Sequence, residues 1–300
     1  MPSCSKRFVE FRRARPLLGT FVEIRVTSAN ATEAERAVCA AFTVIERVQA
    51  LMSFHDPASE ISRLNQFAAA RAVRVDAWTY RVLRHAKKLH AVTGGLFDIA
   101  TAPALVRHGW LPSGAAPLPA GDGSTADIAL LAGHRVRFRR PLLIDLGGIA
   151  KGFAVDQAIA ALRRHGATAG VVNAGGDLRV FGAASEAVHL RRPETPGEFH
   201  LLTDLKNSAL ASSAAYFAAR RIDGQLCAPV IDPHTGQPSR ESHSVTVRAR
   251  TCCLADALCK VVWLAGATAA APVLRHYRAH AWLLSSRQAP AQPNKSRHAA

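Results

Sequence analysis

The sequence has no run of 18 or more apolar residues, and its arginine-rich first 19 residues contain no apolar stretch typical of a signal peptide. The first absence argues against a membrane-spanning helix. The second argues against export through a cleaved leader. From the sequence we therefore expect a cytoplasmic protein without a transmembrane segment.

Cysteine and aromatic residues are too few to define a site by themselves. The six cysteines include no C-x-x-C pair, which argues against a zinc site. Six cysteines in 300 residues are also too sparse for a disulfide-stabilised scaffold. Phe, Trp and Tyr make up 6% of the chain, and no basic block is interleaved with them.

Acidic residues are scarce as well, because 22 Asp and Glu stand against 38 Lys and Arg and leave a net charge of +16. Such a balance favours an anionic partner, which can be a nucleic acid, an acidic membrane or a phosphate-bearing ligand. The arginines are scattered among alanines. We therefore expect most of the charge to lie on solvated surface and part of it to attract a pyrophosphate.

A hydrophobic content of 49% in 300 residues is enough for one large domain or two closely packed lobes. Hydrophobic periodicity predicts strands and helices that alternate irregularly, which favours the α+β class over a regular βαβ array. The expected strands are 20–26, 136–138, 142–146, 170–173, 178–181, 187–190 and 244–249. The expected helices are 32–52, which begins with a capping box at Thr32 to Glu35, and 76–92, 150–165 and 254–265.

The densest chemical signal is IDLGGIAKGFAVD at 144–156, followed by VVNAGGDLRVFG at 171–182. Gly147 and Gly148 let the backbone turn sharply after a strand and approach a ligand. The first N–H groups of the following helix favour an anion, and Lys151 adds a positive charge there. Two such glycine turns indicate a phosphate-bearing ligand, although glycine turns also occur in ordinary loops.

Four further segments carry turn or helix-start signals that also have plain structural explanations. They are 52–65, where Ser59 can cap a helix, 94–98, where glycines end a helix before an acid, the turn at 230–236, and 255–260, where Asp256 lies near a helix start.

In their order and spacing, these segments resemble the FAD:protein FMN transferase (ApbE) family. The resemblance covers roughly Pro16 to Gly266 and includes Leu18-Gly19-Thr20, MSFHDPASEISRLN, GGLFDIATAPAL, DLGGIAKGFAVD, VNAGGDLRVFG, IDPHTG and ADAL. It implies a two-lobed mixed α/β architecture with FAD in a cleft between the lobes. The flavin transferase domain would span 16–284, after a basic extension at 1–15 and before a polar tail at 285–300 that we expect to be disordered.

The resemblance also implies site residues. Magnesium would lie beside the pyrophosphate, held by the carbonyl of Gly148, by Asp256 and by a hydroxyl about one helical turn later. The implied reaction is Mg²⁺-dependent transfer of FMN from FAD to a Ser or Thr hydroxyl of a target flavoprotein, with release of AMP. By similarity, the residues that would line the flavin site are Leu18, His55, Leu96, Phe97, Asp98, Asp145, Lys151, Val230 and Ile231.

The sequence departs from the family at the metal and base positions. Cys259 and Lys260 stand where the hydroxyl ligand is expected. A thiol is a poor magnesium ligand, and Lys260 either places an ammonium group near the phosphates or points to solvent. Ala228-Pro229 replaces a His that many members carry, which leaves His234 and Lys260 as catalytic candidates. The family's Ser-Gly turn near a Tyr reads Ser213 to Tyr216 here.

Several alternatives remain open at the level of sequence. His55 stands where members often place an aromatic that contacts the flavin, but a lone His is also common on surfaces. The same scaffold would suit a Mg²⁺-dependent FAD hydrolase that yields FMN and AMP, or a non-catalytic FAD-binding protein. The charge alone suggests a nucleic-acid binder, whereas the resemblance implies no nucleic acid. Relatives are often exported, so a periplasmic or inner-membrane location is the alternative to the cytoplasm.

Overall fold

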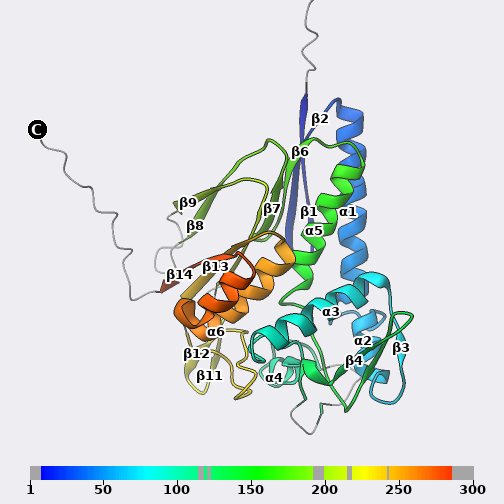
Figure 1. Cartoon of the computed structure of the whole chain (residues 1–300), viewed down its shortest axis with the longest axis vertical. Helices are drawn as coiled ribbons and strands as arrows, with labels where there is room; N and C mark the ends of the chain where they lie inside the picture. The colour runs from blue at the N-terminus through cyan, green and yellow to red at the C-terminus, as the bar shows by residue number, and fades with distance from the viewer. Residues whose placement is uncertain are drawn as a thin grey trace, which may run out of the picture.

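The computed structural model describes residues 8–113, 118–119, 123–191, 199–214, 218–241 and 243–285. Its centre is a seven-stranded sheet in the order β1-β2-β6-β7-β10-β13-β14 (Figure 1). Every neighbouring pair in this sheet is antiparallel. The strands are β1 (Val9–Leu17), β2 (Thr20–Ser28), β6 (Ala169–Ala174), β7 (Asp177–Phe181), β10 (Ala209–Ala214), β13 (His243–Ala249) and β14 (His280–Ser285).

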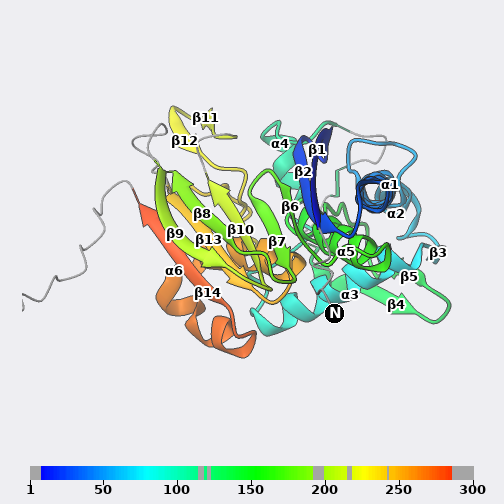
Figure 2. The ribbon, with the colours of Figure 1, turned by 90° about the horizontal axis from the view of Figure 1, so that it is seen from above.

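Three long helices cover one face of this sheet, as the view from above shows (Figure 2). They are α1 (Ala31–Met52), α5 (Ala150–Arg164) and α6 (Cys252–His276). α1 contacts β1 and β2, α5 contacts β6 and β7, and α6 contacts β7, β10, β13 and β14. The helices pack on this face because side chains alternate between the two faces of a strand. In β2 the apolar side chains Val22, Ile24 and Val26 all point to this face, where they are fully buried in the same core as Phe42 of α1.

The hairpin of β8 (Glu186–Arg191) and β9 (Phe199–Leu205) packs against the opposite face of the sheet. Val188 and Leu205 form a second apolar cluster there with Val171, Val180 and Leu210. A further short hairpin joins β11 (Arg220–Ile222) to β12 (Gln225–Cys227). We call this sheet, with its helices and hairpins, the large lobe.

A small lobe holds a three-stranded sheet in the order β3-β5-β4 and several helices. Its elements are α2 (Glu60–Phe67), β3 (Val73–Arg74), α3 (Ala77–Val92), α4 (Ala102–Arg107), a 3₁₀ turn (Thr125–Asp127), β4 (Ile128–Leu131) and β5 (Arg135–Phe138). One buried apolar core runs through both lobes. The architecture is therefore the two-lobed α+β arrangement that the sequence predicts.

The strand predicted at 142–146 is wrong, because this segment pairs with side chains and loops instead of a neighbouring strand. Asn65 donates to the Ile144 carbonyl at 3.0 Å and accepts from the Ile144 N–H at 2.8 Å. The Asp145 N–H donates to the carbonyl of Ile99 at 2.9 Å. β5 pairs instead with β3 and β4, both of which lie earlier in the chain.

The capping box predicted at Thr32 is also wrong, since the N-cap of the first long helix is Asn30. Its side chain accepts from the N–H of Glu33 at 2.9 Å, and the helix begins at Ala31. Asn and Thr both satisfy the free N–H groups of a first turn. Local sequence therefore did not distinguish the two positions.

Residues 9–15 of the segment assigned to a basic extension at 1–15 belong to the large sheet. Residues 9–17 form β1, which pairs along its whole length with β2. Its arginines face acidic partners, as in Arg12 with Glu23 at 2.6 Å and Arg15 with Glu46 at 3.2 Å. The tail predicted to be disordered lies, after Ser285, outside the described residues.

α6 extends beyond the helix predicted at 254–265, but its regular first part ends where expected. Gly266 has non-helical dihedral angles of φ 76° and ψ 163°, and the helix continues after this kink. By length and composition alone α6 could cross a membrane. In the structure it packs on β10, β13 and β14.

Candidate active site

Two adjoining cavities lie where the lobes meet. The main cavity, of about 550 Å³, is lined by residues of the small lobe such as Leu96 and by residues of the large lobe such as Lys260. The side cavity, of about 270 Å³, is lined by the β1–β2 turn, the end of α1 and the loop that follows α1. Both are lined by Gly19, Leu111, Asp145, Gly147 and Lys151.

The wall of the side cavity depends on a tight turn between β1 and β2. Leu18 and Gly19 both have positive φ angles, 57° and 71°, a conformation that costs glycine little but is uncommon for leucine. The Leu18 N–H donates to the Gln49 side-chain oxygen at 2.6 Å, which fixes the turn on α1. His55 faces the same cavity from an exposed loop that is tied by a hydrogen bond from Ser59 Oγ to the Ser53 carbonyl at 2.6 Å.

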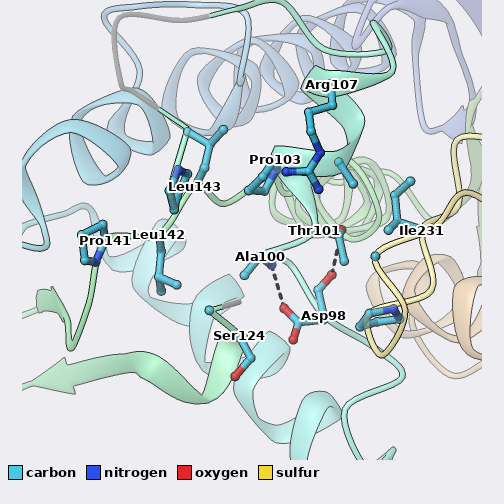
Figure 3. Close-up of a pocket in the computed structure, with 15 residues that line it drawn as sticks. Asp98, Ala100, Thr101, Pro103, Arg107, Ser124, Pro141, Leu142, Leu143 and Ile231 are labelled. Atoms are coloured by element: carbon cyan, nitrogen blue, oxygen red, sulfur yellow. Dashed lines mark hydrogen bonds between the residues drawn. The ribbon is translucent and has the colours of Figure 1, made fainter. Parts of the chain in front are cut away.

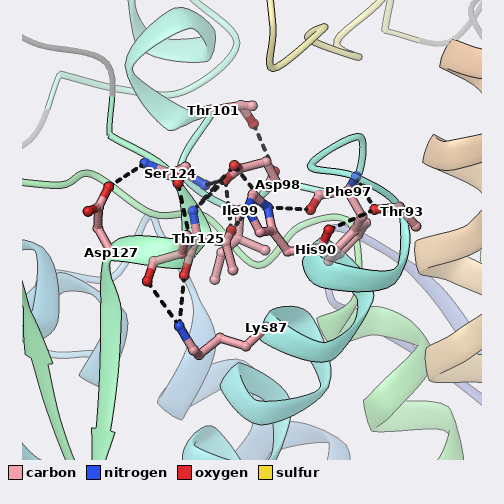
Figure 4. Close-up of polar contacts among 12 residues, drawn as sticks. Lys87, His90, Thr93, Phe97, Asp98, Ile99, Thr101, Ser124, Thr125 and Asp127 are labelled. Atoms are coloured by element: carbon pink, nitrogen blue, oxygen red, sulfur yellow. Dashed lines mark hydrogen bonds and ion pairs between the residues drawn. The ribbon is translucent and has the colours of Figure 1, made fainter.

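Asp98 organises the small-lobe wall of the main cavity (Figure 4). Its side chain is 4% exposed. Its Oδ1 accepts from the Ala100 N–H at 2.7 Å and from the Thr125 hydroxyl at 2.7 Å, and Oδ2 lies 3.2 Å from His90 Nδ1. Asp98 therefore holds the 94–101 loop in place beside the cavity, a role that leaves its carboxylate little freedom to move.

A third cavity, of about 220 Å³, opens on the other side of the Asp98 loop (Figure 3). It lies between α4, the 141–143 segment and the 231–236 turn, and it shares Asp98, Thr101 and Ile231 with the main cavity. The Asp98 loop therefore borders both the main cavity and the third cavity.

The segment between Asp145 and α5 forms the floor shared by the main and side cavities. Asp145 Oδ2 accepts from the Gly147 N–H at 3.0 Å. Burial raises the pKa of the Asp145 carboxyl, and its hydrogen bonds and the charge of His55 oppose that rise. The N-cap residue of α5, Ile149, makes no side-chain capping bond, and two N–H groups of the first turn already have partners. The Ala150 N–H donates to the Leu146 carbonyl at 2.8 Å, and the Gly152 N–H donates to Asp256 Oδ2 at 3.2 Å.

Two lysine–aspartate pairs stand at the large-lobe end of the main cavity. Lys151 Nζ donates to Asp177 Oδ2 at 2.6 Å. Lys260 Nζ donates to Asp256 Oδ1 at 2.7 Å and to Ser213 Oγ at 3.1 Å. Both aspartates are 1% exposed, whereas the side chains of Lys151 and Lys260 are 34% and 23% exposed. The lysines therefore separate two buried carboxylates from the cavity.

The charges of these pairs support one another. Burial alone would lower the pKa of Lys151, but the Asp177 and Asp256 carboxylates raise it above its ordinary value. Burial alone would raise the pKa of Asp256, but Lys260 and Lys151 hold it below its ordinary value. The cavity therefore faces the Lys151 and Lys260 side chains, each paired with a buried carboxylate.

The donor set does not fit the magnesium site that the sequence resemblance implies. Asp256 Oδ1 is engaged by Lys260, and its Oδ2 accepts from the Gly152 N–H at 3.2 Å. An ammonium group has no lone pair for a metal. Within the described part of the chain, no group of three or more His, Cys, Asp or Glu is arranged to hold a metal ion.

The catalytic candidates differ in their placement. Lys260 lines the main cavity, whereas His234 is exposed on the 232–236 turn and lines none of the three cavities. Cys259 is fully buried, its Sγ lies 3.3 Å from the Ala211 carbonyl oxygen, and burial raises its thiol pKa to about 12. Of the Ser213 to Tyr216 segment, residues 215 and 216 lie outside the described residues.

All nine residues that the sequence places at the flavin site line the main cavity, the side cavity or both. Gly148 and Lys260 line the main cavity, and Asp256 lies directly behind Lys260. Sequence reasoning missed Trp110, Leu111, Ser212 and Trp263 as lining residues. It also missed Thr125, which is 27 residues from Asp98 and has no local signal that would connect the two.

Comparison with known proteins gives one consistent result. The sequence matches the ApbE family over residues 18–283. It is 30% identical to a FAD:protein FMN transferase of Haemophilus influenzae over 244 residues, 74% of this chain and 70% of that protein. It is 27% identical to one of Treponema pallidum over 301 residues, covering 90% and 83% of the two chains.

Solved structures agree with the sequence match. The crystal structure of an ApbE protein from Thermotoga maritima has a TM-score of 0.79 to this chain at 25% identity, and the match covers 94% of this chain and 96% of that one. The flavinyl transferase ApbE of Pseudomonas stutzeri has a TM-score of 0.79 at 19% identity, covering 94% and 92%. At 19% identity, the similarity to the Pseudomonas stutzeri protein shows a shared fold alone.

Proposed function

This chain belongs to the ApbE family, and we propose that it transfers the FMN half of FAD to a Ser or Thr hydroxyl of a target flavoprotein and releases AMP. The observation that carries the proposal is the convergence of nine residues, spread from Leu18 to Ile231 and including Lys151, on two adjoining cavities, the larger of which Lys260 also lines. The main cavity of about 550 Å³ lies in the range of roughly 300–1,000 Å³ typical of small-molecule sites.

In the proposed reaction the acceptor oxygen forms a bond to the FMN phosphorus. The bond between that phosphorus and the bridging oxygen breaks, and AMP leaves with the electron pair. Such transfer depends mainly on positioning and on positive charge near the phosphates. Lys151 and Lys260 supply that charge, and apolar residues such as Phe97 and Val230 offer contact to the flavin.

The acceptor hydroxyl must also lose a proton. Asp145 is suited to take it, because it lines both cavities and its pKa is raised by burial, which brings a carboxylate nearer to the operating pH of a general base. Asp177 and Asp256 are engaged by lysines, and Asp98 is engaged by three backbone and side-chain donors. Asp145 is therefore the proton acceptor that this geometry favours.

Magnesium is part of the function that the family resemblance implies, and the pyrophosphate of FAD would itself offer oxygen ligands to it. The residues around Asp256 do not complete a metal site. We therefore assign no step of the reaction to a metal ion.

The test is incubation of the purified protein with FAD and the acceptor protein of one of its relatives, followed by mass spectrometry. We expect a mass increase of one FMN on the acceptor and one AMP for each modified chain. AMP release without a modified acceptor would identify the protein as an FAD hydrolase instead. FAD binding without AMP release would identify a non-catalytic binding protein.

A further inference from the structure

The position implied for a divalent cation is surrounded by residues of this chain that converge on Lys260. Its ammonium group lies 2.7 Å from Asp256 Oδ1 and 3.1 Å from Ser213 Oγ. Its methylene chain passes over Gly148, where a Cβ would stand 3.4 Å from Lys260 Cε. Gly148, Asp256 and residue 260 are the three positions of the implied metal site, and here the Lys260 side chain itself fills the space between the other two.

The charges around Lys260 are balanced without a metal ion. Asp256 and Asp177 contribute two buried carboxylates, and Lys260 and Lys151 lie against them at 2.7 Å and 2.6 Å. A buried carboxylate needs a cationic or hydrogen-bonding partner, and each of these two has one. A divalent ion at Asp256 would have to share a carboxylate oxygen with an ammonium group, which the repulsion between two cations opposes.

We propose that the Lys260 ammonium group replaces the divalent cation in this protein, so that FAD binding and FMN transfer proceed without magnesium. This inference rests on the proposed function of the same site. Lys260 is only 23% exposed and lines the main cavity, so a pyrophosphate there would meet an ammonium group that Asp256 and Ser213 orient. AMP leaves toward Lys260 and Lys151, while the acceptor proton passes to Asp145.

The experiment measures FAD affinity by flavin fluorescence in excess EDTA and in millimolar MgCl₂, and FMN transfer under the same two conditions. Four proteins are compared: the wild type, Lys260→Thr, Lys260→Arg and Lys206→Thr. The threonine restores the hydroxyl that the family resemblance implies, the arginine keeps a cation, and Lys206 is an exposed lysine whose loss controls for net charge.

The wild type, Lys260→Arg and Lys206→Thr are expected to bind FAD equally well in EDTA and in magnesium. Lys260→Thr is expected to lose about tenfold or more in affinity in EDTA, an effect of the size of one strong charge contact, and to regain it with magnesium. A change from metal-independent to metal-dependent FAD binding in Lys260→Thr would show that Lys260 takes the place of the divalent cation. A purely structural role would weaken binding equally in both conditions.

The inference would be overturned if the affinity of the wild type for FAD rises severalfold with magnesium and falls in EDTA. The proposed function would remain intact. Equal affinity of Lys260→Thr and the wild type in both conditions would overturn it as well. If Lys260→Thr does not fold, the FAD affinity of the wild type in EDTA and in magnesium still tests the inference. FAD binding without FMN transfer in either condition would contradict the proposed function, whatever the response to magnesium.

Discussion

At the scale of single residues, the aspartates around the cavities differ in the groups that their carboxylates contact. Asp256 and Asp177 are buried behind lysines, and Asp98 holds a loop together. Asp145 accepts one hydrogen bond from the Gly147 N–H on its Oδ2 and lines both cavities. These contacts balance charge at the first two and hold a loop at the third, and they leave Asp145 as the acid suited to the proton transfer proposed above.

Asp145→Asn is expected to lower kcat for FMN transfer by about 100-fold or more, because general-base catalysis typically contributes that much. The amide keeps the size of the side chain, so the KM for FAD should change little. Steady-state kinetics of AMP release check both values. A loss of FAD affinity with an unchanged kcat would assign Asp145 to binding alone.

His234→Ala is the matched variant, since His234 lies outside the three cavities. Its kcat should stay within about twofold of the wild type, a change of about 0.4 kcal/mol in the activation free energy. A large loss in this variant would show that the 232–236 turn moves toward the reacting atoms.

At the scale of elements, the position of Asp256 depends on how closely α5 and α6 approach. A Cβ placed on Gly152 would overlap the Cys252 carbonyl oxygen and stand 2.7 Å from the Cys253 nitrogen. The Gly152 N–H also donates to Asp256. Asp156 of α5 accepts from the N–H groups of Cys252 and Cys253 at 3.0 Å each, which fixes the first turn of α6 on α5.

Gly152→Ala should therefore destabilise the fold, because the added methyl group meets backbone rather than a flexible side chain. Forced insertion of one methyl group into a packed core typically costs about 1–3 kcal/mol or more. Urea unfolding followed by circular dichroism measures the free energy of unfolding. Gly148→Ala is the control, because its Cβ would meet only the Lys260 side chain at 3.4 Å, and its stability should be close to that of the wild type.

The start of α3 provides a prediction about pH. Burial alone would raise the pKa of Asp76, but its bond from the Trp78 N–H and its contact with Arg47 lower it below the ordinary value of 3.8. Because the folded pKa is lowered, the charged form adds stability above the ordinary pKa, and this stability is lost as the pH falls through the lowered value.

Asp76→Asn keeps an N-cap side chain but cannot titrate. We expect it to be less stable than the wild type at pH 7 by about 1 kcal/mol, in line with measured cap and charge effects. The difference should shrink as the pH falls below 3.8. Urea unfolding at a series of pH values checks the trend, and a difference that does not change with pH would contradict it.

Elements with strong local signals were the ones that sequence predicted well. β2, α3 and α5 have regular periodicity and clear ends, and the structure has them within two residues of the prediction. The 142–146 segment is equally apolar, but its backbone bonds go to Asn65 and Ile99, which lie far away in sequence. The pairing of β1 with β2 was missed because Arg13 and Arg15 stand on the half-buried face of β1, where they pair with Glu35 and Glu46 of α1 and hide the alternation.

The candidate site was predictable in its residues but not in its charge arrangement. Glycine turns and family resemblance located Asp145, Lys151 and Asp256. The contact between Lys260 and Asp256 depends on the rotamer of a long side chain, and the partner of Lys151 is Asp177 in β7, which follows a separate turn. Neither pairing has a sequence signal, so the sequence left the direction of Lys260 open.

At the scale of the whole molecule, the net charge of +16 should speed the encounter with FAD, whose pyrophosphate is negative. Screening shortens the Debye length from about 10 Å at 0.1 M salt to about 3 Å at 1 M. The association rate constant for FAD should therefore fall several-fold over this range, as for other steered encounters. Stopped-flow fluorescence measures it.

Riboflavin, which carries no phosphate, is the control for this prediction. Its association rate constant should change little with salt, because there is no ionic charge on it for the protein field to attract. An equal salt dependence for the two flavins would indicate that salt acts on the protein conformation instead.

The cavities take their walls from both ends of the described chain, with Gly19 in the first hairpin and Lys260 in the last long helix. A nascent polypeptide leaves the ribosome from its N-terminus onward, so Leu18 and Gly19 emerge long before α6 exists. Capture of FAD must then wait until α6 has been synthesised. A truncated product that stops before α6 would keep most of the glycine turns and still be unable to acquire its nucleotide.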